Sequence, residues 1–136
     1  MSDNKRKGNR SEGALAAAFL RKGYTVLFPF GECERYDMVI DRGRGFERVQ
    51  IKTGRRVKNR SCVAFNACSS LAHHGNGCGR RDYRGQIELF GVFCEETGIT
   101  YVVPVEQVGR RQGSLRLAPS RNGQHKKIMW AKDFEI

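Results

Sequence analysis

The chain has 136 residues, and its 25 lysines and arginines outnumber its 14 acidic residues enough to give a net charge of +11 at pH 7. This length suits one domain whose core needs no disulfides, and the charge favours a polyanionic partner held by salt-sensitive phosphate contacts. An odd number of cysteines, with neither a signal peptide nor an apolar run long enough for a bilayer, argues against a disulfide-stapled or membrane protein and predicts a cytoplasmic one.

The first predicted element is a helix over residues 10–22, with Asn9 as its N-cap and Gly23 as its stop. Helical spacing places Glu12 at the top of an apolar stripe that consists of Leu15, Ala16, Phe19 and Leu20. Two interpretations of Glu12 stay open. Its carboxylate points toward a buried site, or it completes a capping box with Asn9 and only satisfies a backbone donor.

Three strands are predicted next, over residues 24–28, 36–41 and 46–53. A connection over residues 29–34 joins the first two, and a glycine-bounded turn at residues 43–45 makes the last two an antiparallel hairpin. In such a hairpin, the start of one strand lies beside the end of the other.

Polar side chains are expected to converge at that end of the hairpin. Alternation along residues 46–53 puts Gln50 and Lys52 on the face opposite Ile51, and Asp37 lies at the start of the partner strand. Carboxylate, amide and backbone carbonyl oxygens suit a hard ion such as Mg²⁺, for which Mn²⁺ can substitute. The candidate metal ligands are therefore Asp37, the Gln50 side chain and the Ile51 carbonyl.

Such a group suits phosphodiester hydrolysis, because a divalent ion polarises the phosphoryl group and lowers the pKa of water. Lys52 would orient that water or stabilise charge in the transition state. Glu12 would hold a second ion or its water from the helix side. The candidate catalytic residues are Glu12, Asp37, Gln50 and Lys52.

In the second half of the chain, the sequence patterns that predict secondary structure are weaker. Strands are predicted over residues 61–65, 86–93, 100–103, 115–117 and 127–130. Residues 66–81, rich in Gly, Ser, His and Arg, are predicted to be an irregular basic insertion. This insertion either reaches a DNA groove with Arg80, Arg81 or His74, or is a flexible surface loop.

The cysteines allow a zinc interpretation built from Cys62, Cys68, His73, His74 and Cys78. No C-x-x-C pair occurs and the separations match no common zinc module, which favours ordinary reduced thiols. Cys33 and Cys94 are expected in or beside core strands.

Basic residues cluster on both sides of the proposed site, where they would position a DNA duplex. The candidate DNA-binding residues are Lys7, Arg10, Arg35, Arg55, Arg56, Lys58, Arg60, Arg80, Arg81 and Arg84. The alternative is that each cluster is only solvated surface.

The order Glu12, Asp37, Gln50-x-Lys52 on helix, strand and strand resembles the PD-(D/E)xK nuclease superfamily, with Tyr36 where proline is usual. More narrowly, the chain resembles the homing endonucleases of group I introns, which share the glutamine at the position of Gln50. That likeness runs through residues 7–12, 23–26, 29–31, 35–37, 49–54, 83–87, 101–104 and 115–117. The first half is also similar to archaeal Holliday-junction resolvases, which carry an acid in place of Gln50.

The resemblance implies an α/β fold, a restriction-endonuclease-like mixed β-sheet flanked by helices, over residues 1–136. It also implies a Mg²⁺-dependent, site-specific endonuclease that makes double-strand breaks in DNA. One site cuts one strand, so a homodimer or homotetramer is expected. The gene would belong to a phage or its host, and the protein would associate with the nucleoid. Two alternatives remain: a junction-resolving nuclease, and an inactive DNA-binding protein in which Gln50 marks lost metal chemistry.

Overall fold

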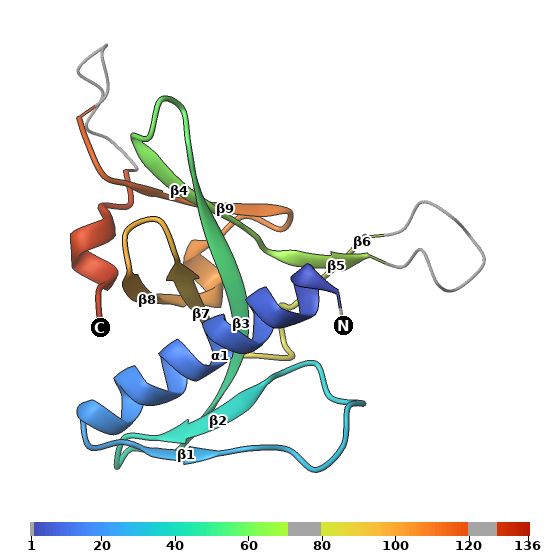
Figure 1. Ribbon diagram of the computed structural model, residues 1–136. Helices are drawn as coiled ribbons and strands as arrows, with labels where there is room; N and C mark the ends of the chain where they lie inside the picture. The colour runs from blue at the N-terminus through green and yellow to red at the C-terminus, as the bar shows by residue number, and fades with distance from the viewer. Residues whose placement is uncertain (1, 71–79, 120–127) are drawn as a thin grey trace.

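The computed structural model of the chain describes residues 2–70, 80–119 and 128–136 (Figure 1). One long helix lies across a strongly bent sheet, and a two-stranded ribbon projects from one side. The elements in chain order are α1 (Asp3–Arg21), β1 (Thr25–Leu27), β2 (Met38–Asp41), β3 (Phe46–Val57), β4 (Cys62–Asn66), β5 (Cys68–Ser70), β6 (Arg80–Asp82), β7 (Leu89–Cys94), β8 (Ile99–Pro104), the 3-10 helix η2 (Val105–Gln107), β9 (Gln112–Arg116) and the 3-10 helix η3 (Ala131–Phe134).

The long strand β3 organises the sheet. Its first residues pair antiparallel with β2 as far as Val49, its middle pairs parallel with β7, and its end at Arg55–Val57 pairs antiparallel with β4. Strands β1, β8 and β9 continue the sheet beyond β2, β7 and β4 respectively. Because β2 stops opposite Val49, the residues that follow in β3 are free of that partner, and this is where the sequence places Gln50 and Lys52.

Helix α1 packs on the face formed by β3 and β7, and its apolar residues enter the smaller of two buried clusters. That cluster consists of Leu15, Phe19, Met38, Ile40, Val49, Ile51 and Leu89. Gly91 permits the close approach, because a Cβ there would lie 2.8 Å from Cδ1 of Ile51 and 3.0 Å from Cγ of Leu15. The helix is thereby held close to the strand that carries the proposed site.

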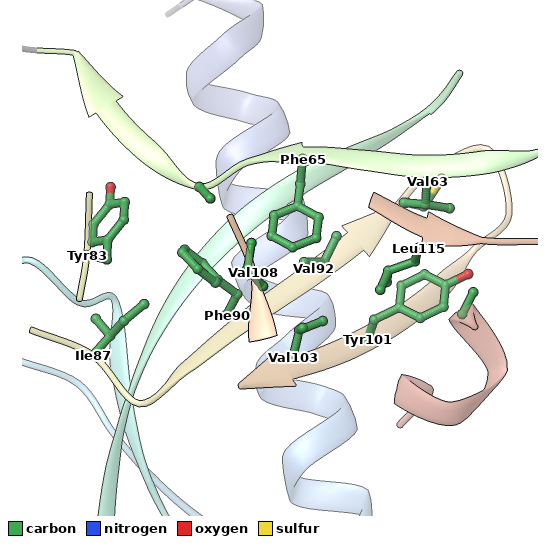
Figure 2. Close-up of a cluster of buried hydrophobic side chains, with 13 residues drawn as sticks. Val63, Phe65, Tyr83, Ile87, Phe90, Val92, Tyr101, Val103, Val108 and Leu115 are labelled. Atoms are coloured by element: carbon green, nitrogen blue, oxygen red, sulfur yellow. The ribbon is translucent and has the colours of Figure 1, made fainter. Parts of the chain in front are cut away.

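A second, larger cluster fills the space between β7–β8 and β4–β9 (Figure 2). Its largest members include Phe65, Phe90 and Tyr101, which are at most 1 % exposed. Burial of each such side chain contributes about 1.5–3 kcal/mol to folding. Phe90 and Val92 of β7 belong to this cluster, whereas Leu89 belongs to the cluster that α1 enters, so the two clusters pack on opposite faces of β7.

The helix prediction is wrong at both its start and its register. The helix begins at Asp3, and Ser2 is its N-cap, with Oγ accepting from the Lys5 amide. Asn9 therefore lies inside the helix, and the capping-box interpretation of Glu12 is wrong. The buried stripe runs through Ser11, Leu15, Ala18 and Phe19. Leu20, expected inside, is 61 % exposed.

The strand predictions hold with shifted bounds, and three details differ. Residues 66–81 are not wholly irregular, since β5 and β6 pair as a short ribbon; residues 71–79, with His73, His74 and Cys78, lie outside the described residues. Trp130 makes only an isolated bridge to Arg116 where a strand over residues 127–130 was expected. Cys33 is exposed rather than in the core, whereas Cys94 is buried as expected.

Two absences concern the described residues alone. Within residues 2–70, 80–119 and 128–136, no three His, Cys, Asp or Glu side chains are grouped as a metal site would require. In that same part of the chain, no helix has the length and apolar character needed to span a bilayer.

Candidate active site

Asp37 occupies the residue just before β2, at the point where β2 leaves β3. Its amide donates to the Val49 carbonyl at 2.9 Å, and its carboxylate Oδ2 accepts from the Ile51 amide at 2.8 Å. The Asp37 carboxylate thus accepts the hydrogen bond that a backbone carbonyl would accept from Ile51 if β2 extended further toward its N-terminus. A carboxylate has two oxygens, so Asp37 can accept this bond and still bind a cation.

Burial changes the proton affinity of the two acids that face this position. The pKa of Asp37 is raised by burial, although the Ile51 amide and the Lys52 charge act in the opposite direction. The pKa of Glu12 is raised by burial and, to a smaller extent, by the negative charge of Asp37. A bound cation would offset both effects, because it favours the ionised carboxylates.

Glu12 and Asp37 line the same pocket of about 400 Å³. Helix α1 supplies the first and the end of the β1–β2 connection supplies the second. The Oγ atoms of Ser11 and Thr53 lie 2.7 Å apart and join the helix to β3 one residue away from Glu12 and from Lys52. This contact holds the helix acid in register with the strand.

Gln50 and Lys52 lie on β3 as the alternation predicts, both half-buried. The Gln50 amide nitrogen is 3.5 Å from the Ile51 carbonyl, a weak contact that a cation could replace. The Lys52 ammonium donates to the Tyr83 hydroxyl at 3.2 Å. The structure therefore brings Asp37 against the Ile51 amide and close enough to Lys52 to feel its charge, and Glu12 lines the same pocket as Asp37. Gln50 and Lys52 do not line that pocket, and within the described part of the chain the Gln50 side chain hydrogen-bonds only with its neighbour Ile51.

These donors fit a divalent ion of the Mg²⁺ type. Asp37 and Glu12 offer carboxylate oxygens, and Gln50 and the Ile51 carbonyl offer neutral ones, which together are the hard ligands that such an ion takes. Among the described residues no three acids are grouped closely enough for a metal site, although two further acids, Glu32 and Glu34, line the same pocket.

Sequence reasoning missed several residues of this site. The β1–β2 connection contributes Glu32 and Glu34 to the pocket wall, where the sequence showed only a linker. Two acids close before Asp37 in the chain were the signal available. Tyr83 was part of a noted motif without a role, because its contact with Lys52 joins segments that are 31 residues apart.

The predicted DNA-binding residues fall into two groups in space. One surrounds the β7–β8 turn, where Arg10 pairs with Glu95 and the Arg56 amide donates to Glu96. Lys7 also lies close enough to act on Glu95. Arg55, Lys58 and Arg60 are exposed on the end of β3 and the turn after it.

The second group lies near the β5–β6 ribbon. Arg81 and Arg84 are exposed, although one Arg84 nitrogen donates to the Val108 carbonyl at 2.9 Å. Arg80 is the first residue of β6, and its side chain lies outside the described part of the structure. Arg35 donates to four acceptors within the protein, so its guanidinium is engaged in internal contacts.

The family model described as PD-(D/E)XK endonuclease matches residues 2–136, and the chain belongs to this family. "Protein 5.3" of Escherichia phage T7 is 29% identical over 97 residues, which are 71% of this chain and 77% of that protein.

Among solved structures, the bacterial homing endonuclease I-Ssp6803I superimposes with a TM-score of 0.78 at 22% identity, covering 98% of this chain and 89% of that one. This likeness confirms the restriction-endonuclease-like fold. The Holliday junction resolvase Hjc of Archaeoglobus fulgidus gives a TM-score of 0.49 at 15% identity, over 81% of this chain and 84% of that one.

Proposed function

We propose that this protein is a Mg²⁺-dependent, site-specific DNA endonuclease of the homing-endonuclease type, active also with Mn²⁺. The observation that supports the proposal most is the hydrogen bond that the Ile51 amide, between Gln50 and Lys52 in the chain, donates to Asp37. Membership of the endonuclease family supports it. We propose further that residues 1–136 form one nuclease domain with a basic insertion at residues 66–81.

In this proposal each side chain has one task. Asp37, the Gln50 side chain and the Ile51 carbonyl would hold the ion, and Glu12 would hold a second ion or its water from the helix side. The Ile51 amide fixes the orientation of Asp37. The ion, when bound, supplies positive charge that polarises the phosphodiester and makes water easier to deprotonate. Lys52 brings an ammonium group to the same place, where it orients water or stabilises the charge that develops on the phosphate.

Duplex DNA is the proposed substrate, since the net charge is +11 and the basic residues on both sides of the proposed site can contact phosphates. One site cuts one strand, so a double-strand break requires two copies, and a homodimer or homotetramer is proposed. The similarity to a phage T7 protein supports a phage or host gene.

The test is cleavage of a library of linear duplexes and four-way junctions, with Mg²⁺ or with EDTA, by the wild type and by Asp37→Asn. Metal-dependent cutting at one linear sequence, lost in the variant, is the expected result. Cutting confined to junctions would replace the proposal with a resolvase. Salt-sensitive binding without any cleavage would replace it with a DNA-binding protein in which Gln50 records lost chemistry.

A further inference from the structure

We infer that Tyr83, clamped by Arg35, is a positioning residue that holds the Lys52 ammonium in place for catalysis; this rests on the proposed nuclease function. The Lys52 ammonium donates to the Tyr83 hydroxyl at 3.2 Å and lies 4.8 Å from the centre of its ring. A lysine side chain has four flexible bonds, and two contacts with one buried group restrict them. Tyr83 thus supplies the restraint that β3 alone cannot give.

Tyr83 is itself held rigidly. It is 4 % exposed, and its ring meets Phe90 edge to face, with ring centres 5.6 Å apart and an interplanar angle of 89°. Its carbonyl accepts from the amides of Gln86 and Ile87, which close a turn directly after it. Figure 2 shows Tyr83 at one end of the large cluster, next to Phe90 and Ile87. The hydroxyl is therefore a fixed acceptor.

Arg35 clamps this tyrosine from the segment that leads into Asp37. Its guanidinium carbon lies 3.9 Å from the centre of the Tyr83 ring. Its nitrogens donate to Gln86 Oε1 at 2.7 Å, to the Asp82 carbonyl at 2.8 Å, to the Arg81 carbonyl at 3.3 Å and to Ser69 Oγ. Both strands of the β5–β6 ribbon are thus tied to the tyrosine that touches Lys52.

These contacts account for Tyr83 and Gln86, which the proposed function leaves without a role. Tyr83 meets Lys52, and Gln86 meets Arg35. Gly85 has a φ of +79°, in the left-handed region that favours glycine, and Ile87 is 2 % exposed in the large cluster. Tyr83 contacts the Lys52 ammonium directly, and Gln86 supports Tyr83 through Arg35.

The first experiment compares Tyr83→Phe with a matched control, Tyr101→Phe. Both changes remove one hydroxyl from a buried ring of the same cluster, and Figure 2 shows the two tyrosines at opposite ends of it. Tyr83→Phe keeps the ring contacts and loses only the acceptor. Single-turnover cleavage at saturating DNA and Mg²⁺ should slow about tenfold or more, the loss expected for a hydrogen bond to a charged group.

In the same experiment, the Kd for DNA measured with EDTA and the thermal midpoint of Tyr83→Phe should match those of the wild type. Tyr101→Phe should cut at the wild-type rate. Unchanged cleavage by Tyr83→Phe would overturn the inference. So would a loss of rate that only follows a loss of folded protein, or that Tyr101→Phe shares.

Arg35 is tested by Arg35→Lys beside Arg35→Ala. A lysine keeps the charge but lacks the planar fork that reaches four acceptors, so both variants should cut slowly and bind DNA with an unchanged salt slope. If Arg35 instead contacts a phosphate, Arg35→Ala should reduce the salt slope by about one unit and Arg35→Lys should restore it. That second pattern would remove Arg35 from the inference.

A readout without DNA separates this inference from the nuclease proposal. The mobility of the Lys52 side chain can be followed by NMR in protein that carries ¹⁵N- and ¹³C-labelled lysine. Lys52 should become more mobile in Tyr83→Phe and stay unchanged in Tyr101→Phe. If the wild type cuts nothing, the nuclease proposal fails; if Lys52 is equally mobile in all three proteins, the positioning role fails.

Discussion

Carboxylates in two regions of this protein have opposite electrostatic surroundings. In the pocket at the end of β2, burial raises the pKa of Asp37 and of Glu12, and the two negative charges face each other. At the two ends of β7, Arg48 lowers the pKa of Glu88 and Arg10 lowers that of Glu95. Arginines pair with acids elsewhere in the protein, but within residues 2–70, 80–119 and 128–136 no arginine forms an ion pair with Asp37 or Glu12.

The two surroundings have opposite consequences for folding. An acid with a lowered pKa stabilises the folded state above the pKa of the unfolded chain, and that contribution is lost as pH falls through the lowered value. An acid with a raised pKa does the reverse: its charge costs free energy once pH rises above the ordinary value. The pocket acids therefore oppose folding at neutral pH, an arrangement typical of functional sites.

The largest expected effect comes from breaking the pocket directly. Asp37→Asn and Lys52→Ala should each lower the cleavage rate by about a thousandfold or more, because each removes charge from the reacting site. DNA binding in EDTA should stay close to that of the wild type. Gel-based cleavage and fluorescence anisotropy on the same duplex measure the two properties, and undiminished cutting by either variant would mean that the site is placed wrongly.

A smaller loss, about a hundredfold, is expected for Glu12→Gln, which keeps the shape of the side chain and removes its charge. Because Ser2 rather than Asn9 caps the helix, the change should leave thermal stability intact. Circular dichroism melting beside the cleavage assay checks both. A variant that cuts normally but melts earlier would give Glu12 a purely structural role.

The pH dependence sharpens the comparison further. Protonated carboxyl groups cannot bind Mg²⁺, and the pKa values of Asp37 and Glu12 are raised. The Mg²⁺ concentration that gives half-maximal cleavage should therefore fall as pH rises and these two groups ionise. Because both pKa values are raised, this fall should occur at a higher pH than it would for unperturbed carboxyl groups. Titrations of cleavage with Mg²⁺ at a series of pH values measure this. A half-maximal concentration independent of pH would contradict it.

The smallest effects concern stability. Asp37→Asn keeps an oxygen that accepts from the Ile51 amide and removes a buried charge, so the metal-free protein should gain about 1 kcal/mol or less, a few degrees in Tm. Glu88→Gln should lose roughly 0.5 kcal/mol, since the Arg48–Glu88 pair is 38% exposed on both sides and solvent screens it. Calorimetry at pH 7 in EDTA measures the Tm of both variants. Changes in Tm of the same sign would contradict the proposed difference between the two regions.

The part of the site carried by the hairpin could be predicted from sequence because local rules fix it. A two-residue alternation and a short turn place Asp37 against the Gln50–Lys52 end with little freedom, and the Ile51–Asp37 bond shows that proximity. The restriction-endonuclease-like fold was predicted from the resemblance to PD-(D/E)xK nucleases, and the likeness to a solved homing endonuclease confirms it. The roles of these residues stay predictions until cleavage is measured.

The features that escaped depend on distant contacts or on weak local signals. The first turns of α1 consist of polar residues and Gly8, so no apolar period announces a helix before Ser11. The predicted apolar stripe included Leu20, whereas the buried face of α1 runs through Leu15, Ala18 and Phe19. The strands of the β5–β6 ribbon have three residues each and no alternation, and Tyr83 reaches Lys52 only through the folded sheet.

The single strand β3 spans both halves of the molecule, and this has a consequence for divergence among relatives. The spacing between Gln50 and Lys52 is set by the covalent repeat of an extended chain, about 7 Å for two residues, and by pairing with β7. Turns at either end of β3 can lengthen, shorten or change charge without altering that spacing. The turns that flank β3 can therefore vary while the relative positions of Gln50 and Lys52 stay the same.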